Sequence, residues 1–287
     1  MRNKVWLSVD WDFFVRELEE WDWAHRESAF YRGMVWQVRE TNGLMQGVDF
    51  REETDPNTHS NPKPLEFWSH LEELGYDFTG ADVFVTDSHA YGSPVFMNRK
   101  ARADRIVHFD AHHDLGYKAE TIKKNIENET SDCGDWQFHV LQHYQKLRSL
   151  IVYPAWKGSM EWDETWGSDQ VYKIVNAGGS LFKRVKHVVG VDNEVVRAAA
   201  GKVDAIHICR SGAWSPPWLD QMFVDFVDVL GEHTFTAPMT PFEDEEGLSP
   251  LKPREYTFDP DSMKEPLRVQ QEALEALIRE NSRNEEE

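Results

Sequence analysis

The sequence of 287 residues predicts an α/β protein of three layers, in which a mostly parallel sheet lies between helices on both faces. Three observations predict this fold class. Apolar runs of strand length recur along the chain and are nearly continuous, as in strands that are covered on both faces. Segments whose apolar residues have helical spacing lie between these runs. Strands and helices that alternate in this way are typical of a parallel sheet.

Six strands and three helices are predicted in this pattern, and the strands are rich in Val and Ile. The strands are 4–10, 81–87, 105–110, 150–155, 186–192 and 203–211. The helices are 64–75, 135–147 and 215–231. The first and third helices stop at a Gly, and the third begins with Ser-Pro-Pro, which favours a helix start. Two stretches rich in turn residues, 41–63 and 236–262, predict long loops.

The chain has no evident internal repeat or second domain, so we expect one α/β domain over residues 1–262. This length is sufficient to bury a substantial hydrophobic core. Residues 263–287 predict a terminal amphipathic helix, and its acidic end, "RENSRNEEE", is typical of a solvated charge run.

The charge of the chain limits its partners. There are 31 basic and 51 acidic residues, which gives a formal net charge of −20. A field of this sign argues against nucleic acid and anionic membranes as partners and favours cationic ligands. No stretch approaches the roughly 18 apolar residues of a membrane-spanning helix. The sequence predicts no particular oligomeric state.

Cysteine usage and the start of the chain indicate a cytoplasmic protein. The two cysteines, Cys133 and Cys209, imply no disulfide framework and fit a reducing compartment. The first apolar run is interrupted by Asp10 and Asp12, and no small-residue cleavage site follows it. We therefore expect no signal peptide.

Three of the predicted strands end in titratable residues. These are Asp10 and Asp12 after the first strand, Asp87 and His89 after the second, and Asp110, His112 and Asp114 after the third. Residues two apart in an extended chain point to the same side, and ligands bind beyond the carboxyl ends of parallel strands. So many carboxylates would repel one another without cations, and their number favours two metals about 3.5–4 Å apart. A set of oxygen and nitrogen ligands without thiolate favours Mn²⁺, with Zn²⁺, Fe²⁺, Co²⁺ or Ni²⁺ as alternatives.

Some of these residues also have ordinary structural interpretations. An Asp pair after a strand can cap a helix, but four titratable groups within 110–114 are hard to explain by capping. His139 and His143 have the spacing of metal ligands on a helix, or of an amphipathic face. The Trp-rich segments 19–28 and 209–218 could pack in the core or line the mouth of a pocket. Cys133 has no evident activating base. We expect the following histidines to be structural or exposed: His25, His59, His70, His187, His207 and His233.

These motifs resemble those of the arginase/agmatinase (ureohydrolase) superfamily. "DAHHD" at 110–114 is similar to its D-A-H-x-D motif, "VDWDFF" at 9–14 to its D-x-D motif, and "TDSHA" at 86–90 to its G-G-D-H motif. Together with "HFDAHHDL" and "ICRS", they are most similar to the peptide arginases, which convert arginine side chains of precursor peptides to ornithine in ribosomal natural-product biosynthesis. The D-x-D motif comes first here, so the motif order is permuted relative to ordinary arginases.

The resemblance implies a site with two Mn²⁺ ions and a set of residue roles. One ion would be held by Asp10, His89, Asp110 and Asp114, and the other by Asp10, Asp12, Asp110 and His112. Asp87 would orient a ligand. Asp114 would accept a proton from the attacking water, and His113 or His139 would protonate the departing ornithine amine. The carboxylate that holds the guanidinium would be Glu27, Asp135 or Glu52. The substrate would be an arginine-containing peptide, and the products ornithine and urea.

Three alternatives remain at this point. The same metal site could act on another bond, as in agmatinase-like, formimino-hydrolase or deacetylase-like enzymes. A phosphatase of the haloacid-dehalogenase type would use Asp10 as its nucleophile but would leave "DAHHD" unexplained. The chain could also be a peptide-binding module whose metals only brace the fold.

Overall fold

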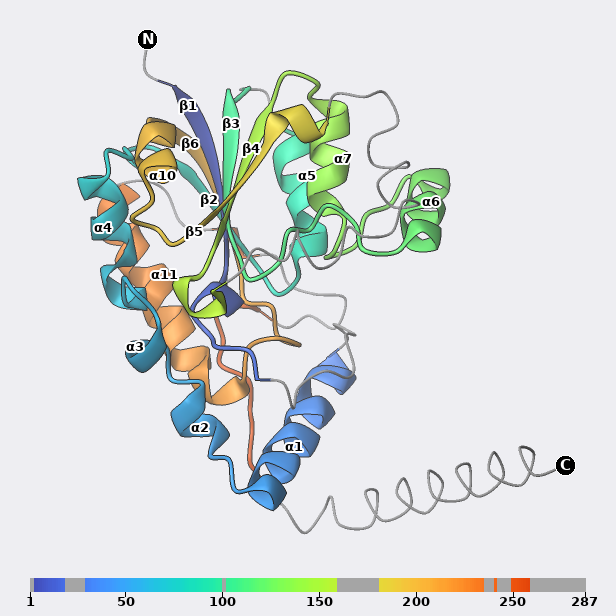
Figure 1. The fold of residues 1–287 in the computed structure, drawn as a ribbon, viewed down its shortest axis with the longest axis vertical. Helices are drawn as coiled ribbons and strands as arrows, with labels where there is room; N and C mark the ends of the chain where they lie inside the picture. Colours follow the sequence, from blue (N-terminus) through green and yellow to red (C-terminus); the bar gives the residue numbers. More distant parts are fainter. Residues whose placement is uncertain are drawn as a thin grey trace, which may run out of the picture.

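The computed structural model describes residues 3–18, 29–99, 102–158, 181–234, 240–241 and 249–258. Its centre is a parallel sheet with helices on both faces (Figure 1), so the predicted three-layer α/β class is confirmed. The strand order is β5-β4-β3-β1-β6-β2-β7, and every neighbouring pair is parallel. The strands are β1 (Lys4–Asp10), β2 (Asp82–Thr86), β3 (Arg105–Phe109), β4 (Arg148–Tyr153), β5 (Val185–Val189), β6 (Lys202–Cys209) and β7 (Thr240–Pro241).

The described helices cover the two faces of this sheet. The α-helices are α1 (Ala29–Gln46), α2 (Phe50–Glu53), α3 (Pro56–His59), α4 (Phe67–Glu73), α5 (Gly92–Met97), α6 (Ala119–Asn128), α7 (Trp136–His143), α10 (Glu194–Ala199) and α11 (Asp220–Thr234). Short 3-10 helices are η1 (Trp11–Phe13), η3 (Pro64–Glu66), η4 (His89–Tyr91), η5 (Ala155–Lys157), η6 (Phe182–Arg184) and η7 (Pro217–Leu219). In Figure 1, α5 and α7 lie against one face, and α4, α10 and α11 lie against the other.

Alternate residues of β1 supply the two halves of the core. Val5, Leu7 and Val9 belong to the larger apolar cluster, which also contains the buried faces of α4 and α11. Trp6 belongs to the other cluster, where its ring stacks on Phe96 of α5 at 5.2 Å between centroids. Because the side-chain period of a strand is two, Ser8 and Asp10 continue the Trp6 side. The candidate site therefore lies above the α5 and α7 face of the sheet.

The predicted loop over 41–63 is wrong. Helix α1 continues to Gln46, and α2 and α3 follow it. Both short helices begin at an Asp whose side chain caps the first turn. Asp49 accepts from the backbone N–H groups of Arg51 and Glu52, and Asp55 accepts from that of Asn57. The same Asp and Pro residues that indicated turns are thus helix starts.

The other predicted boundaries differ by a few residues. Helix α7 ends at His143 rather than at 147, and α11 continues past Gly231 to Thr234, which is 2% exposed and packed. Within the predicted loop 236–262, the structure describes β7 and the segment 249–258, which contains no helix or strand. The predicted helix at 263–287 lies outside the described residues.

Candidate metal centre

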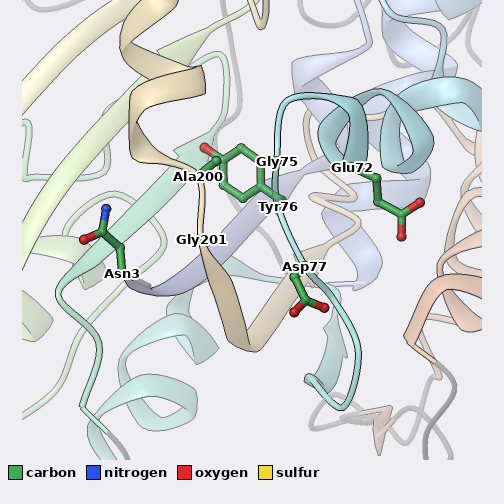
Figure 2. Close-up of a pocket in the computed structure, with 7 residues that line it drawn as sticks. All are labelled: Asn3, Glu72, Gly75, Tyr76, Asp77, Ala200 and Gly201. Carbon is green, nitrogen blue, oxygen red and sulfur yellow. The ribbon is translucent and has the colours of Figure 1, made fainter. Parts of the chain in front are cut away.

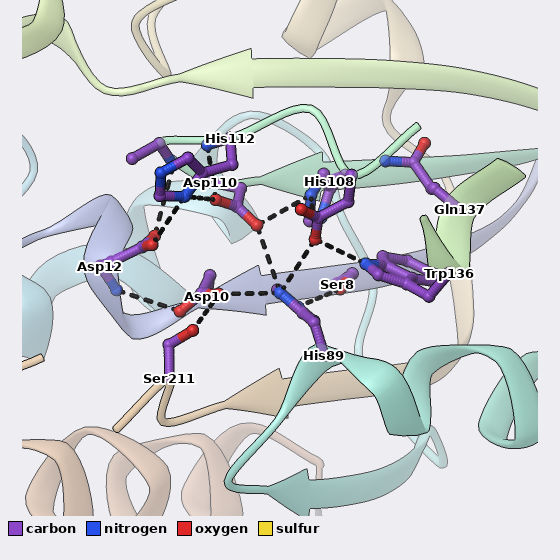
Figure 3. A network of polar contacts seen from close by, with 12 residues as sticks. Ser8, Asp10, Asp12, His89, His108, Asp110, His112, Trp136, Gln137 and Ser211 are labelled. Carbon is purple, nitrogen blue, oxygen red and sulfur yellow. Dashed lines mark hydrogen bonds and ion pairs between the residues drawn. The ribbon is translucent and has the colours of Figure 1, made fainter. Parts of the chain in front are cut away.

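Residues from three strand ends meet at His89, the first residue of η4, which begins three residues after β2 ends at Thr86. Its Nδ1 lies 2.7 Å from Asp10 Oδ2, 3.3 Å from Asp110 Oδ2 and 3.2 Å from Asp114 Oδ2. Figure 3 shows the contacts of the His89 ring with Asp10 at the end of β1 and with Asp110 after β3. The permuted motif order does not prevent this arrangement, because β1 pairs directly with β3. We call His89 and the three carboxylates around its Nδ1 the buried half of the site.

A second group surrounds His112. Its Nδ1 lies 3.0 Å from Asp12 Oδ2 and 3.4 Å from Asp110 Oδ1. The two oxygens of Asp110 therefore face different imidazoles, as Figure 3 shows. The backbone N–H of Asp12 also donates to Asp10 Oδ1 at 3.1 Å, which ties the two groups together. We call His112 and the carboxylates around its Nδ1 the outer half. All six predicted ligands thus lie in one cluster, with Asp110 shared.

The cluster brings four carboxylates together in a buried site, where burial and mutual repulsion disfavour their charged form. Asp10, Asp12, Asp110 and Asp114 are at most 5% exposed. Burial and the neighbouring Asp10 and Asp110 carboxylates raise the pKa of Asp12 well above its usual value, and burial and Asp110 raise the pKa of Asp114. Such shifts indicate that the site favours added positive charge, which protons or a bound cation can supply.

For the two imidazoles, burial and the neighbouring negative groups shift the pKa in opposite directions. Burial alone would lower the pKa of His89, but the neighbouring Cys209 thiol and the Asp10 carboxylate raise it well above its usual value. Burial opposes the charged form of His112 as well, and Glu17 and Asp12 raise its pKa. The pKa shift of His89 thus comes first from Cys209 and then from Asp10, and that of His112 comes from carboxylates.

The other ring nitrogen of each imidazole, Nε2, also has a polar partner. Ser8 Oγ lies 3.1 Å from Nε2 of His89, and Glu17 Oε1 lies 3.0 Å from Nε2 of His112. Lys157 donates from Nζ to the carbonyl of Ala111 at 2.6 Å and lies 3.5 Å from Glu17 Oε2. Although burial alone would raise it, His112 and Lys157 lower the pKa of Glu17 to about 2. Partners of this kind fix which nitrogen of a ligating histidine faces the metal.

Two carboxylates have their own fixed donors. Ser211 donates from Oγ to Asp10 Oδ2 at 2.8 Å, and the Trp136 indole N–H donates to Asp114 Oδ2 at 2.6 Å. Ser211 and Asp114 also have left-handed backbones, with φ of 52° and 50°. Left-handed backbone is uncommon in non-glycine residues; Glu129 at the end of α6 also has it, as a helix cap, whereas Ser211 and Asp114 have it beside the cluster.

A row of polar side chains crosses the sheet two residues before the candidate ligands Asp10 and Asp110 along their strands. The strand register places Ser8 of β1 beside His108 of β3 and His207 of β6, and it places Asp10 beside Cys209. His108 Nε2 lies 2.9 Å from Asp110 Oδ2, and the His89 ring lies 5.2 Å from the rings of both His108 and His207. The ligand cluster therefore rests on buried imidazoles rather than on apolar side chains.

Sequence reasoning missed several of these residues. They are Ser8, Glu17, His108, Cys209 and Ser211. One available signal was a polar residue two positions before a predicted ligand at a strand end. Because the side-chain period of a strand is two, such a residue and the ligand lie on the same face of the sheet. Ser8 precedes Asp10 in this way, and His108 precedes Asp110. Glu17 gave no such signal, because its position depends on the conformation of the segment after η1.

The predicted proton donors have different surroundings. His113 is fully buried, accepts a hydrogen bond from the backbone N–H of Leu115 and stacks on Tyr117 at 4.3 Å. Burial and the neighbouring imidazoles of His187 and His112 lower the pKa of His113 well below its usual value, so it is neutral near pH 7. His139 lies on α7, with Nε2 3.5 Å from an oxygen of Asp135.

Of the predicted substrate carboxylates, the structure describes Asp135 and Glu52, and neither contacts the cluster around Asp110. Asp135 is buried, but it accepts hydrogen bonds from the Asn125 side chain and from the backbone N–H of Asp132, which holds the loop before α7. Glu52 is exposed on α2, outside the buried cluster. Glu27 lies outside the described residues.

Asp87, expected to orient a ligand, forms a buried ion pair. Its two carboxylate oxygens accept from Nε and Nη2 of Arg210 at 2.5 and 2.7 Å, across the β2–β6 pair. Arg210 also donates to Asp220 at 3.2 Å. This pair anchors the start of the segment 210–215, which carries Ser211 to the site.

The two Trp-rich segments contribute unequally. Trp214 lies against His112 at 4.7 Å between ring centroids, at the side of the cluster nearest to solvent. Trp218 instead packs edge-on against Trp36 at 5.5 Å. The segment 19–28 lies outside the described residues. One of the two tryptophans in 209–218 is therefore part of the site and the other is part of the core.

The donor set fits divalent metal ions. Within the part of the chain that the structure describes, three groups have ligand atoms close enough to share an ion. They are Asp10, His89 and Cys209; His89, His108 and Asp110; and Asp12, Asp110 and His112. Asp110 Oδ2 is buried between two imidazoles, 2.9 Å from His108 Nε2 and 3.3 Å from His89 Nδ1. Three carboxylate oxygens share the single N–H that His89 Nδ1 can donate, so they are suited to a cation.

The opposite edge of the sheet carries a hollow of a different kind. It has a volume of about 500 Å³ and lies between Asn3, Tyr76, Asp77 and Gly201, where β1 and β6 begin (Figure 2). Tyr76 donates its hydroxyl to the carbonyl of Val196. The groups in this hollow are accounted for by such local contacts, and the histidines and carboxylates gather at the other edge.

Comparisons of the chain with protein-family models, with curated proteins and with solved structures find no match. None of the described helices is both long and apolar enough to cross a membrane.

Proposed function

We propose that this protein is a dinuclear metal-dependent hydrolase that converts arginine side chains of a peptide to ornithine and releases urea. One observation carries the proposal. Six ligands predicted from three motifs, which are spread over about a hundred residues, lie in one buried cluster in which Asp110 faces both imidazoles. Two metals bridged by a shared carboxylate would use this geometry directly.

The proposed ligands follow the two halves, except that Asp10 would also hold the outer ion. Asp10, His89, Asp110 and Asp114 would hold the buried ion, and Asp10, Asp12, Asp110 and His112 would hold the outer one. Carboxylate and imidazole ligands favour Mn²⁺. When bound, the two ions supply Lewis acidity and lower the pKa of the water that attacks the guanidinium carbon.

The chain's own residues supply orientation and proton transfer. Trp136 fixes one oxygen of Asp114, and Asp114 accepts the proton that the attacking water releases. Of the two predicted donors to the leaving amine, His139 is favoured, because the lowered pKa of His113 keeps that imidazole neutral. Ser8 and Glu17 keep Nδ1 of each ligating imidazole facing the carboxylates.

Charge and exposure support a cationic side chain as the substrate. The net charge of −20 attracts cations, and His112, Glu17 and Trp214 lie on the more accessible side of the cluster. The resemblance to peptide arginases supports an arginine within a peptide. The phosphatase alternative is disfavoured, because Asp10 is already engaged by Ser211 and His89.

The test uses the full chain loaded with Mn²⁺ and a varied set of arginine-containing peptides. We expect one urea for each arginine converted and a peptide mass that falls by CH₂N₂. Asp114→Asn should remove the activity. Asp228→Asn is the matched control, because it makes the same change at an exposed position on α11.

Two results would contradict the proposal. One is the absence of both urea and mass change across the peptide set with metal-loaded protein. The other is turnover of agmatine, free arginine or acylated lysine in preference to every peptide, which would assign the site to another ureohydrolase reaction.

A further inference from the structure

Cys209 lies inside the candidate metal centre. It is the last residue of β6, it is fully buried, and the strand register places it beside Asp10. It is not part of a disulfide. The sequence-based preference for Mn²⁺ assumed a ligand set without sulfur, and this position of the thiol changes that assumption.

The geometry of the thiol is that of a possible ligand. The ligand atoms of Asp10, His89 and Cys209 all lie within 4.8 Å of one another. Atoms bonded to one ion at about 2.0–2.3 Å lie within about 4.5 Å of one another, so at most a small adjustment is needed.

A second observation also points to a cation at this depth. Buried oxygens of Asp10, Asp110 and Asp114 all lie within 3.3 Å of His89 Nδ1, which can donate a single hydrogen bond. Without an ion, only protons and the neighbouring imidazoles could offset this buried carboxylate charge, and burying unpaired charge is costly.

We propose that Cys209 is a ligand of the buried metal, so that the ion held there with Asp10 and His89 is one that accepts thiolate, such as Zn²⁺ or Fe²⁺, in preference to Mn²⁺. This inference rests on the dinuclear centre of the proposed function. On binding, the S–H bond breaks, the sulfur–metal bond forms, and the proton leaves to solvent. The outer half has no thiol among its described ligands and keeps the preference of an oxygen and nitrogen site.

The test is a Co²⁺ titration of the full-length, metal-free, reduced protein, followed by optical absorption. A thiolate bonded to Co²⁺ gives a near-ultraviolet charge-transfer band, and oxygen and nitrogen ligands do not. We expect this band in the wild type and in Cys133→Ser, and its loss in Cys209→Ser. The chain has two cysteines, so a band that persists in Cys133→Ser identifies Cys209 even if Cys209→Ser does not fold.

The outcomes separate this inference from the proposed function. If two Co²⁺ bind per chain and no charge-transfer band appears, Cys209 is not a ligand and the dinuclear centre stands. A band that disappears in Cys133→Ser also overturns the inference. If no Co²⁺ binds, both proposals fail.

Discussion

The two halves of the candidate metal centre each place one imidazole among carboxylates, but at different depths in the protein. In the buried half the His89 side chain is 2% exposed, and in the outer half the His112 side chain is 15% exposed. Both imidazoles present Nδ1 to carboxylates, and both are held through Nε2. The partner is the neutral hydroxyl of Ser8 in the first case and the carboxylate of Glu17 in the second.

The difference in exposure explains why the two imidazoles have different partners at Nε2. Packing against His108 and His207 restrains the His89 ring, so a hydroxyl suffices behind it. The outer imidazole has fewer neighbours, and a charged partner that is itself held by Lys157 replaces that restraint. We therefore expect the buried half to retain its ion more firmly and the outer half to be the one that meets the substrate.

The largest effect is expected where the halves meet. Asp110→Asn removes charge from the one carboxylate that faces both imidazoles, so both ions should be lost. The activity should fall by more than the roughly 10–100-fold that loss of a supporting partner costs. A urea assay checks this, with Asp228→Asn as the control. Activity within tenfold of the wild type would mean that the halves do not depend on Asp110.

Metal removal should destabilise the wild-type protein because its carboxylates are buried. Each ion that binds only the folded chain contributes about 2.7 kcal/mol when its free concentration is about 100 times its dissociation constant. The free energy of unfolding, measured with and without a chelator, should therefore differ by several kcal/mol. The same comparison on Asp110→Asn should show little change. Equal stability with and without chelator in the wild type would contradict metal binding.

The supporting partners allow a matched pair of substitutions. Glu17→Ala should weaken one of the two ions about 10–100-fold, because it removes a charged partner of His112. Ser8→Ala should weaken the other by about tenfold or less, since a neutral hydrogen bond is worth less than a charged one. Metal titration by calorimetry separates the two events. If both variants weakened the same ion, the division into halves would be wrong.

Trp214 should affect the substrate rather than the metals. Its ring contacts His112, the more exposed of the two imidazoles, so Trp214→Leu should raise KM by about tenfold or less, in line with the roughly 0.5–1.5 kcal/mol of an aromatic contact. The number of bound metals should not change. Trp218→Leu is the control on substrate binding, since that ring packs on Trp36. An unchanged KM in Trp214→Leu would place the substrate elsewhere.

His187 belongs to neither half, so its titration tests how burial alone affects a histidine of this protein. Burial lowers its pKa to about 4, below the roughly 6.5 of an unfolded histidine. Its contribution to stability is therefore present above pH 6.5 and is lost as the pH falls through 4. Relative to His187→Gln, the wild type should lose about 3 kcal/mol of unfolding free energy between pH 7 and pH 4. A difference that does not vary with pH would contradict the shift.

The sequence predicted the sheet and the residues that gather at its carboxyl edge because both follow local rules. Continuous apolar runs marked six strands, and the period of two placed Asp10 with Asp12 and Asp110 with His112 on common sides. The convergence of these pairs followed from the shared edge of a parallel sheet. It required no knowledge of strand order.

What the sequence did not predict depends on strand order and on loop conformation. The row of Ser8, His108 and His207 becomes visible only once β1 is known to lie between β3 and β6. Glu17 reaches His112 through the fold of the segment after η1. Helices α2 and α3 were missed because Asp and Pro signal both turns and helix starts, and packing decides between them.

The most direct test of the account is the number of metal ions bound per chain, measured by elemental analysis of the purified full-length protein after loading and removal of excess metal. A dinuclear centre predicts two ions in the wild type and none in Asp110→Asn. One ion or none in a folded wild-type protein would contradict a dinuclear centre.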